Sequence, residues 1–360
     1  MKFIDEFRNA AHTKALAKHI AEIAGDRELT FMEVCGTHTM AISRFGIRSL
    51  LPKNLRLISG PGCPVCVTAN DYLDHAIALA RLPNVTITTF GDMMKVPAST
   101  SSLTKCRAEA ADVRIVTSTT EALTIAHENP EREVIFLGVG FETTTPTIAA
   151  SLKLAREDNL TNYSVLAAHK LIPPALEALL NGKIRLDGFL LPGHVSAIIG
   201  SDAYKSPLAE HNVAAVVAGF EPTDILGALA ESLEQIVSGK YKVSVEYRRI
   251  VSPEGNIKAK SIVDEVFEPC NASWRGIGII PNSGLRIRED YAAYDAAKRF
   301  DVEVEPTREH KGCRCGEILQ GLCHPSDCPH FGKSCIPDNP VGACMVSGEG
   351  TCAAYYKYST

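Results

Sequence analysis

The sequence predicts an α/β fold with two doubly wound parallel-sheet domains, followed by a smaller α+β domain rich in cysteine. Between residues 31 and 240, short apolar runs alternate with helical patterns, as expected for parallel strands buried on both faces. The tripeptide Gly-Phe-Glu occurs at 140–142 and again at 219–221, which favours two halves over a single eight-stranded barrel. Beyond Gly239 the pattern changes, and from Pro306 onward glycine, proline and cysteine dominate.

The strands are expected at eight apolar runs, most of them β-branched and continuous. These runs lie at residues 29–34, 55–59, 85–90, 113–118, 133–139, 163–168, 188–192 and 214–220. Helical periodicity separates them, for example at 71–82, 120–129 and 222–239. After residue 240 we expect strands around a PEGN turn and then a helix.

Four segments follow from this pattern. Residues 1–25 form an amphipathic helix that packs on either the first or the last domain. Residues 26–120 form the first α/β domain, with the motifs CGTHT and CPVC. Residues 121–240 form the second, with GFETT and PGHVS, and residues 241–360 form the C-terminal domain.

Composition narrows the class of protein. The chain has 360 residues, is 45% hydrophobic and carries a net charge of −5, so it offers no basic surface for nucleic acid or an anionic membrane. No apolar run approaches the roughly 20 residues that span a bilayer. Twelve cysteines in a chain that we expect to be cytoplasmic favour metal binding or redox chemistry over a disulfide scaffold.

The residues that follow the predicted strands are chemically reactive. Ligands of open α/β sheets bind beyond the carboxyl ends of the strands. At these ends lie Cys35 and His38 after the first strand, the CPVC motif after the second, Glu142 after the fifth and His194 after the seventh. We therefore expect thiols, imidazoles and a carboxylate to converge on one rim.

Cys35 and His38 open a helical segment directly after a strand. Backbone amides and the helix dipole favour a thiolate there, the form that binds metal or attacks an electrophile. His38 would bind metal, relay a proton or hydrogen-bond the sulfur. The alternative is a buried inert thiol beside a capping histidine.

Cys63 and Cys66 form a C-x-x-C pair framed by Gly60, Pro61 and Gly62. This spacing suits a dithiol/disulfide couple or half of a metal site. Zinc would need a second pair, and only Cys35 is an obvious neighbour in this part of the chain, so redox exchange is favoured. A turn with two inert thiols is the alternative.

Glu142 follows a buried strand, where it would pair with His194 or with His169. An exposed charge at a strand end is the competing interpretation. The adjacent GVGFETTTP segment matches neither a Walker loop nor a complete G-x-G-x-x-G motif, so nucleotide binding is not predicted.

Seven cysteines crowd between Cys313 and Cys352. Their spacing matches neither zinc ribbons nor common ferredoxins. Prolines hold the segment irregular, so that four cysteines can form a cage. An iron–sulfur cluster is favoured over zinc, and a disulfide-stapled tail is the remaining alternative. Cys106 and Cys270 stand alone.

Five motifs in order resemble the HypD family of NiFe-hydrogenase maturation factors. They are CGTHT (35–39), GPGCPVC (60–66), GFETT (140–144), PGHVS (192–196) and the ending CMVSGEGTCAAYYKY (344–358). They run from residue 35 to 358, so the resemblance spans nearly the whole chain.

The resemblance implies two α/β domains and a third domain that holds a 4Fe–4S cluster. It implies that Cys35 binds the iron that receives cyanide and carbon monoxide, supported by His38, and that Cys63 and Cys66 are a redox dithiol near that iron. The best-matched cluster ligands are Cys315, Cys328, Cys335 and Cys352, with Cys344 as a further candidate. Cys313 and Cys323 have no assigned role.

The resemblance also implies partners. The family forms a stable complex with HypC and receives cyanide from HypE, with HypF upstream, and it serves the hydrogenase large subunit indirectly. The expected function is therefore a redox-active scaffold that, with HypC, assembles an Fe(CN)2CO group. Glu142 and His194 would orient ligands or relay protons beside the iron.

Two other functions fit the residues less well. An iron–sulfur-dependent disulfide reductase would turn over a substrate without HypC, whereas a scaffold would bind HypC stoichiometrically. A zinc-stabilised binding protein with inert cysteines would be colourless and contain no sulfide.

Overall fold

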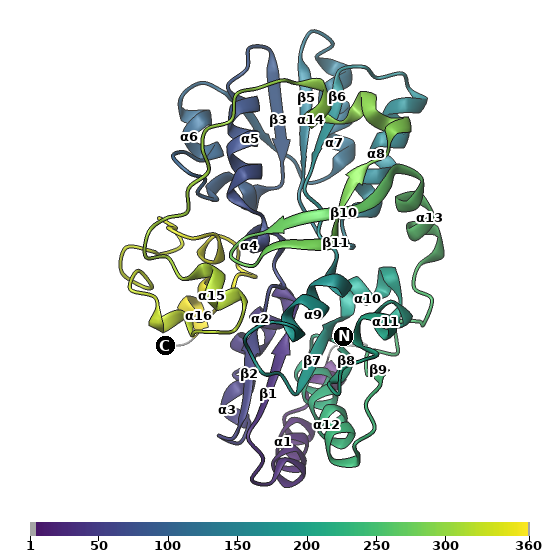
Figure 1. Cartoon of the computed structure of the whole chain (residues 1–360), viewed down its shortest axis with the longest axis vertical. Coiled ribbons are helices and arrows are strands. Elements are labelled where there is room, and N and C mark those ends of the chain that lie inside the picture. The colour runs from purple at the N-terminus through teal and green to yellow at the C-terminus, as the bar shows by residue number, and fades with distance from the viewer. Residues whose placement is uncertain (1–4, 359–360) are drawn as a thin grey trace.

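The fold was determined as a computed structural model, which describes residues 5–358. Two parallel sheets lie one above the other in Figure 1, with a two-stranded hairpin between them and the C-terminal segment against one side. The predicted α/β class is confirmed.

A five-stranded sheet has the order β2-β1-β7-β8-β9, and all its neighbouring strands are parallel. A four-stranded parallel sheet has the order β4-β3-β5-β6. The eight predicted strands all form, and β9 is added. Their bounds are β1 Leu29–Glu33, β2 Leu55–Ser59, β3 Val85–Thr89, β4 Asp112–Ile115, β5 Glu133–Gly138, β6 Tyr163–Ala167, β7 Gly188–Pro192, β8 Ala214–Ala218 and β9 Val243–Val245.

Helices and short 3-10 turns connect these strands. The helices are α1 Ala10–Ala24, α2 Gly36–Arg44, α3 Ile47–Leu50, α4 Pro64–Val67, α5 Asn70–Ala80, α6 Leu103–Ala108, α7 Thr119–Glu128, α8 Thr145–Glu157, α9 Ile172–Leu180, α10 Gly193–Ile199, α11 Lys205–Leu208, α12 Pro222–Ser238, α13 Ile257–Val266, α14 Ala296–Arg299, α15 Cys315–Leu319 and α16 Thr351–Tyr358.

Each sheet is buried on both faces, which explains its continuous apolar runs. Along β1, Met32 belongs to the large central core, whereas Phe31 belongs to the core behind the five-stranded sheet. Along β5, Ile135 faces the central core and Phe136 faces a third core. Successive side chains of a strand point to opposite faces, so each strand joins two cores.

The domain boundary expected at residue 120 needs correction. β3 and β4 precede that residue but pair in the same sheet as β5 and β6, whereas β1 and β2 pair with β7–β9. The segment from β3 to β6 is therefore inserted into the five-stranded sheet, and the single-barrel alternative is excluded. Apolar patterning identifies strands but carries no information on which strands pair.

The region after residue 240 differs from its prediction in one respect. β9 precedes the PEGN turn and α13 follows it, but no second strand forms directly after the turn. The strands of this region are instead β10 (Phe267–Trp274) and β11 (Gly278–Ile287), which pair antiparallel.

The N-terminal helix packs on the five-stranded sheet domain. Ile20 and Ala24 of α1 are fully buried and belong to the same core as Leu226 and Leu229 of α12. The helix therefore packs on the five-stranded sheet, whose strands and helices come from both predicted α/β domains, and not simply on the first of them.

None of the helices within residues 5–358 has both the length and the apolarity to cross a bilayer.

We expect Ile20→Ala to lower the free energy of unfolding by about 2–5 kcal/mol, because it leaves a cavity between α1 and α12. Urea titration measures the change. Ile257→Ala is the matched control, since Ile257 is 71% exposed and its loss should cost less than about 0.5 kcal/mol. Equal effects of the two substitutions would contradict the packing of α1.

Candidate functional site

The predicted rim exists at the carboxyl ends of β1, β7 and β8. Cys35 is the N-cap of α2, directly after β1. His194 lies in the first turn of α10, after β7, and Gly219 and Phe220 follow β8. Because these strands are neighbours in one parallel sheet, their following residues meet at one edge.

The CPVC loop crosses the Cys35 segment at close range. The backbone N–H of Gly36 donates to the carbonyl of Gly62 at 2.8 Å. A Cβ atom on Gly62 would lie 2.1 Å from the backbone nitrogen of Cys35, so only glycine fits there. The crossing places the Cys35 loop directly against the loop that carries Cys63 and Cys66.

The Cys35 thiol is held in its neutral form. Burial raises its pKa to about 12, and the carboxyl groups of Glu349 and Glu33 act in the same direction. Backbone N–H groups of His38 and Thr37 at the start of α2 oppose this shift, as expected at a helix N-terminus. The sequence led us to expect a thiolate at this position. That expectation is wrong for a thiol without a bound metal, because the effect of burial on the pKa outweighs that of the helix N–H groups.

Two carboxyl groups flank Cys35, and neither was singled out from the sequence. Glu33 is fully buried at the end of β1, where its oxygens accept from the Cys35 N–H at 3.0 Å and from the Thr39 hydroxyl. Burial raises the pKa of Glu33 to about 7. Glu349 accepts from the Thr37 hydroxyl at 2.7 Å. The sequence did contain a signal for Glu33, because a charged residue inside the apolar run LTFMEV indicates a buried carboxyl group.

His38 is buried and oriented by one hydrogen bond. Its Nε2 atom lies 2.8 Å from the carbonyl of Gly219, which requires Nε2 to carry the proton. Its Nδ1 atom is buried and has no partner within residues 5–358, so a lone pair remains available. Burial lowers the pKa of His38 to about 4, which keeps the ring neutral.

Phe220 links the two predicted histidines. Its ring lies 4.7 Å from the His38 ring and 4.0 Å from the His194 ring, measured between centroids. Burial lowers the pKa of His194, and Glu349 partly opposes that shift. The structure therefore brings Cys35, His38 and His194 to one site, as predicted, and adds Phe220.

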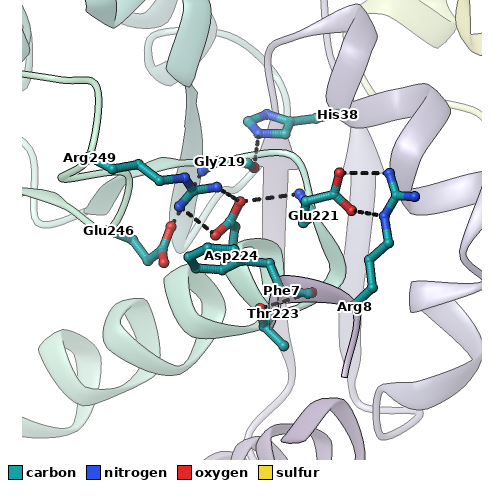
Figure 2. Close-up of polar contacts among 9 residues, drawn as sticks. All are labelled: Phe7, Arg8, His38, Gly219, Glu221, Thr223, Asp224, Glu246 and Arg249. Atoms are coloured by element: carbon teal, nitrogen blue, oxygen red, sulfur yellow. Dashed lines mark hydrogen bonds and ion pairs between the residues drawn. The ribbon is translucent and has the colours of Figure 1, made fainter. Parts of the chain in front are cut away.

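Charged residues behind the site fix the Gly219–Glu221 segment (Figure 2). Asp224 is fully buried, receives two hydrogen bonds from Arg249 and accepts from the Glu221 N–H. The Glu221 carboxylate is held by Arg8, with one contact of 2.8 Å. Glu246 also accepts from the Gly219 N–H at 3.4 Å. These contacts restrain the backbone on both sides of Phe220 and so hold the Gly219 carbonyl that orients His38. Removing one partner of the Arg249–Asp224 ion pair would be costly.

Glu142 is buried, but the expected pairing with His194 or His169 is wrong. Its Oε1 atom accepts from the backbone N–H of Ile172, the first residue of α9, at 2.8 Å. Its Oε2 atom is buried and has no partner in the described chain. Burial raises the pKa of Glu142 to about 7. The exposed-charge alternative is excluded as well.

The C-x-x-C thiols are adjacent. The Cys66 thiol donates to the Cys63 sulfur at 2.7 Å, and the Cys63 sulfur also accepts from the Cys66 N–H. Pro64 starts α4 between them, so the turn is fixed. Burial raises the pKa of Cys66 well above its usual range. A disulfide between these two atoms, with a bond of about 2.05 Å, needs only a small movement.

The tail cysteines surround one pocket. It is lined by Cys313, Cys315, Cys328, Cys335, Cys344 and Cys352. Cys323 does not line it and lies beside Glu317. All twelve cysteines are free thiols. Cys313, which the sequence left without a role, therefore lies among the candidate ligands.

A chain of thiol contacts joins this pocket to the C-x-x-C pair. The Cys344 thiol contacts those of Cys66, Cys315 and Cys352. Cys66 also lies 3.8 Å from the carbonyl oxygen of Ala343. Thiols therefore follow one another from Cys63 to the interior of the pocket.

The donor set of the pocket fits an iron–sulfur cluster. Thiolates are the usual ligands of such clusters, and Ile318, Phe331 and Met345 supply an apolar wall. Within residues 5–358, no three Cys, His, Asp or Glu side chains are already grouped closely enough to hold a metal ion. Binding would therefore draw the thiols inward.

Fold and site together define an α/β protein with a strand-end thiol, a buried dithiol and a cysteine-lined pocket. The family model HypD, described as "Hydrogenase formation hypA family", matches residues 11–359. The chain belongs to the HypD family.

Curated relatives cover the chain almost completely. The hydrogenase maturation factor HypD of Azotobacter vinelandii is 48% identical, over 99% of this chain and 97% of its own. The factors of Rhizobium leguminosarum bv. viciae and Escherichia coli are 46% and 42% identical, each over 99% of this chain and over 96% and 98% of their own. Among solved structures, a D-threo-3-hydroxyaspartate dehydratase from Delftia sp. HT23 is 13% identical over 87% of this chain and 90% of its own. Its TM-score of 0.18 is too low to indicate a shared fold.

We expect the free energy of unfolding of the parent protein to fall between pH 5 and pH 8, and that of Glu142→Gln to fall less. The native state holds the Glu142 proton up to a pKa of about 7, against 4.5 for the ordinary carboxyl group. The parent therefore loses stability between these pH values, by up to about 3 kcal/mol. Urea titrations at pH 5 and pH 8 measure the difference, with exposed Glu131→Gln as control. An equal pH dependence in parent and variant would contradict the burial argument.

Proposed function

We propose that the protein is a redox-active scaffold in NiFe-hydrogenase maturation. Its full-length relatives are named hydrogenase maturation factors, which supports the general role. The observation that carries the specific role is the close crossing of the Cys35 and CPVC loops, with thiol contacts continuing from Cys66 to Cys344. A metal-binding thiol, a dithiol and a cysteine pocket are thus contiguous.

In this proposal Cys35 holds the iron cargo that receives cyanide and carbon monoxide. A soft thiolate suits iron with such ligands. The iron must displace the thiol proton, since burial keeps free Cys35 neutral. Glu33 is a suitable acceptor for that proton, because its carboxyl group has a pKa of about 7 and hydrogen-bonds the Cys35 N–H. His38 presents its unpartnered Nδ1 atom nearby.

Cys63 and Cys66 supply or take up electrons beside the cargo. Joining their sulfurs as a disulfide releases two electrons and two protons, and reduction reverses this change. Because both cysteines are buried, thiols in solution cannot reach them. Thiol–disulfide exchange with the neighbouring Cys344 is therefore the favoured route. A 4Fe–4S cluster in the tail pocket would supply one-electron transfer when bound.

The thiol contacts do not divide the pocket into separate groups. Cys313 contacts Cys315, and Cys344 contacts both Cys315 and Cys352. We therefore keep the ligand set that the family resemblance implies, which is Cys315, Cys328, Cys335 and Cys352, with Cys344 as the alternative fourth ligand. Because Cys344 also contacts Cys66, a relay role suits Cys344 better.

The partners follow from the family resemblance. HypC is the proposed stable partner, and HypE, with HypF upstream, is the proposed source of cyanide. The rim around Cys35 and His194 is the natural contact surface, because cargo bound there must be reached by both. The hydrogenase large subunit is the indirect recipient.

We expect Cys35→Ala to abolish iron-bound cyanide and carbon monoxide while leaving the cluster in place. Infrared spectra of the anaerobically purified complex with HypC measure the diatomic bands, and acid-labile sulfide measures the cluster. Cys106→Ala, which removes another buried thiol, should keep the bands. Diatomic bands that persist in Cys35→Ala would refute the iron site.

A separate expectation concerns the fourth cluster ligand. Cys352→Ser should lower iron and acid-labile sulfide per chain to less than about half of the parent, because a four-thiol cluster loses one ligand. Cys344→Ser should retain both, and Cys323→Ser is the control outside the pocket. Retention in Cys352→Ser combined with loss in Cys344→Ser would make Cys344 the fourth ligand.

A further inference from the structure

A second cavity lies at the carboxyl end of β6, away from the thiol site. It measures about 310 Å³ and is bounded by α5 on one side and by β10 and β11 on another. Tyr72, His75, His169, Lys170, Cys270 and Ser273 are among its lining residues. Neither Cys35 nor the C-x-x-C pair contributes to it. Cavities beyond the carboxyl ends of parallel strands are the usual ligand sites of such sheets.

Lys170 is the unusual group in this cavity. It is only 6% exposed, yet no hydrogen bond or ion pair of its ammonium group is found among residues 5–358. Its backbone is fixed, since its N–H donates to the carbonyl of Gly140 at 2.9 Å. Burial lowers the pKa of Lys170, and the negative charge of Asp71 opposes that shift without forming an ion pair with it. Buried lysines are almost always paired directly, so the ammonium group of Lys170 can still take an anionic partner.

His169 adds a second unsatisfied group. It is 1% exposed, and neither ring nitrogen has a partner in the described chain. Burial lowers its pKa to about 3, so the ring is neutral and has one N–H to donate. A buried donor without an acceptor is costly, and a ligand that accepts hydrogen bonds would remove that cost.

The surrounding charges limit what fits. Lys170 contributes one positive charge from the segment after β6, and Asp71 contributes one negative charge from α5. Burial lowers the pKa of half-buried His75, which favours its neutral form. Arg286 nearby is already paired with Glu268 at 2.7 Å. The cavity therefore has no excess of positive charge that would hold a dianion such as phosphate, and Lys170 alone can pair with at most a single negative charge.

We propose that this cavity binds a small monocarboxylate, whose oxygens pair with the Lys170 ammonium group and accept from His169. The site is independent of the iron cargo and of the cluster. Cys270 of β10 is half-buried and lines the same cavity, so it reports on occupancy.

The test compares two alkylating reagents at Cys270. Iodoacetate carries a carboxylate and iodoacetamide is its neutral analogue. In both reactions the Cys270 thiolate displaces iodide and forms a carbon–sulfur bond. The ratio of their rates, measured by mass spectrometry of the Cys270 peptide from the full chain, cancels any change in the thiolate fraction. It therefore isolates the attraction of the cavity for a carboxylate.

We expect Lys170→Met to lower this ratio on the order of tenfold, since a nearby unit charge is lost. Lys170→Arg, which keeps the charge, should retain the ratio, and exposed Lys14→Met should not change it. Acetate should slow both reagents at Cys270 but not at Cys323. An unchanged ratio in Lys170→Met would overturn the proposal, as would protection by inorganic phosphate but not by acetate.

Discussion

The site depends on a backbone crossing that leaves no room for a side chain. At Gly62 the loop after β2 passes the nitrogen of Cys35 so closely that a single Cβ atom would collide with it. One hydrogen bond between Gly36 and Gly62 fixes the crossing. Every proposed step needs this arrangement, because it places the thiol that would carry cargo beside the dithiol that would exchange electrons. The neighbouring strands of the parallel sheet hold both loops at one edge.

Burial governs the chemistry of the groups at this edge. The same exclusion of water raises the pKa of Cys35 and Glu33 and lowers that of His38. Cys35 and His38 therefore rest in their neutral forms, whereas Glu33, with a pKa of about 7, is close to half-ionised at neutral pH and can accept a proton. A bound cation would reverse the balance, because it stabilises the thiolate directly. The Arg249–Asp224 ion pair lies one layer further back and fixes the backbone rather than the reactive atoms.

The sequence predicted the strands and most of the rim, because both depend on local patterns. Continuous β-branched runs locate strands, and strand ends locate reactive residues such as Cys35 and His194. Strand pairing could not be predicted, since β1 pairs with β7 across a long insertion that leaves no local mark. The partner of Glu142 was missed because it is a backbone N–H at the start of α9. Glu33 was missed because it stood inside a run interpreted as apolar core.

The inserted position of the four-stranded sheet has a consequence for biosynthesis. Strands β3–β6 form one continuous segment, so their sheet can fold while the ribosome is still making the rest. β1 and β2 emerge earlier and can pair with each other, but their sheet is complete only when β1 has paired with β7, and strands so far apart in sequence pair slowly. Cys35 and His38 therefore meet Phe220 only late in synthesis. A nascent chain that is still short exposes its first thiols without the residues that later enclose them, so the iron loading that we propose would take place on the finished polypeptide.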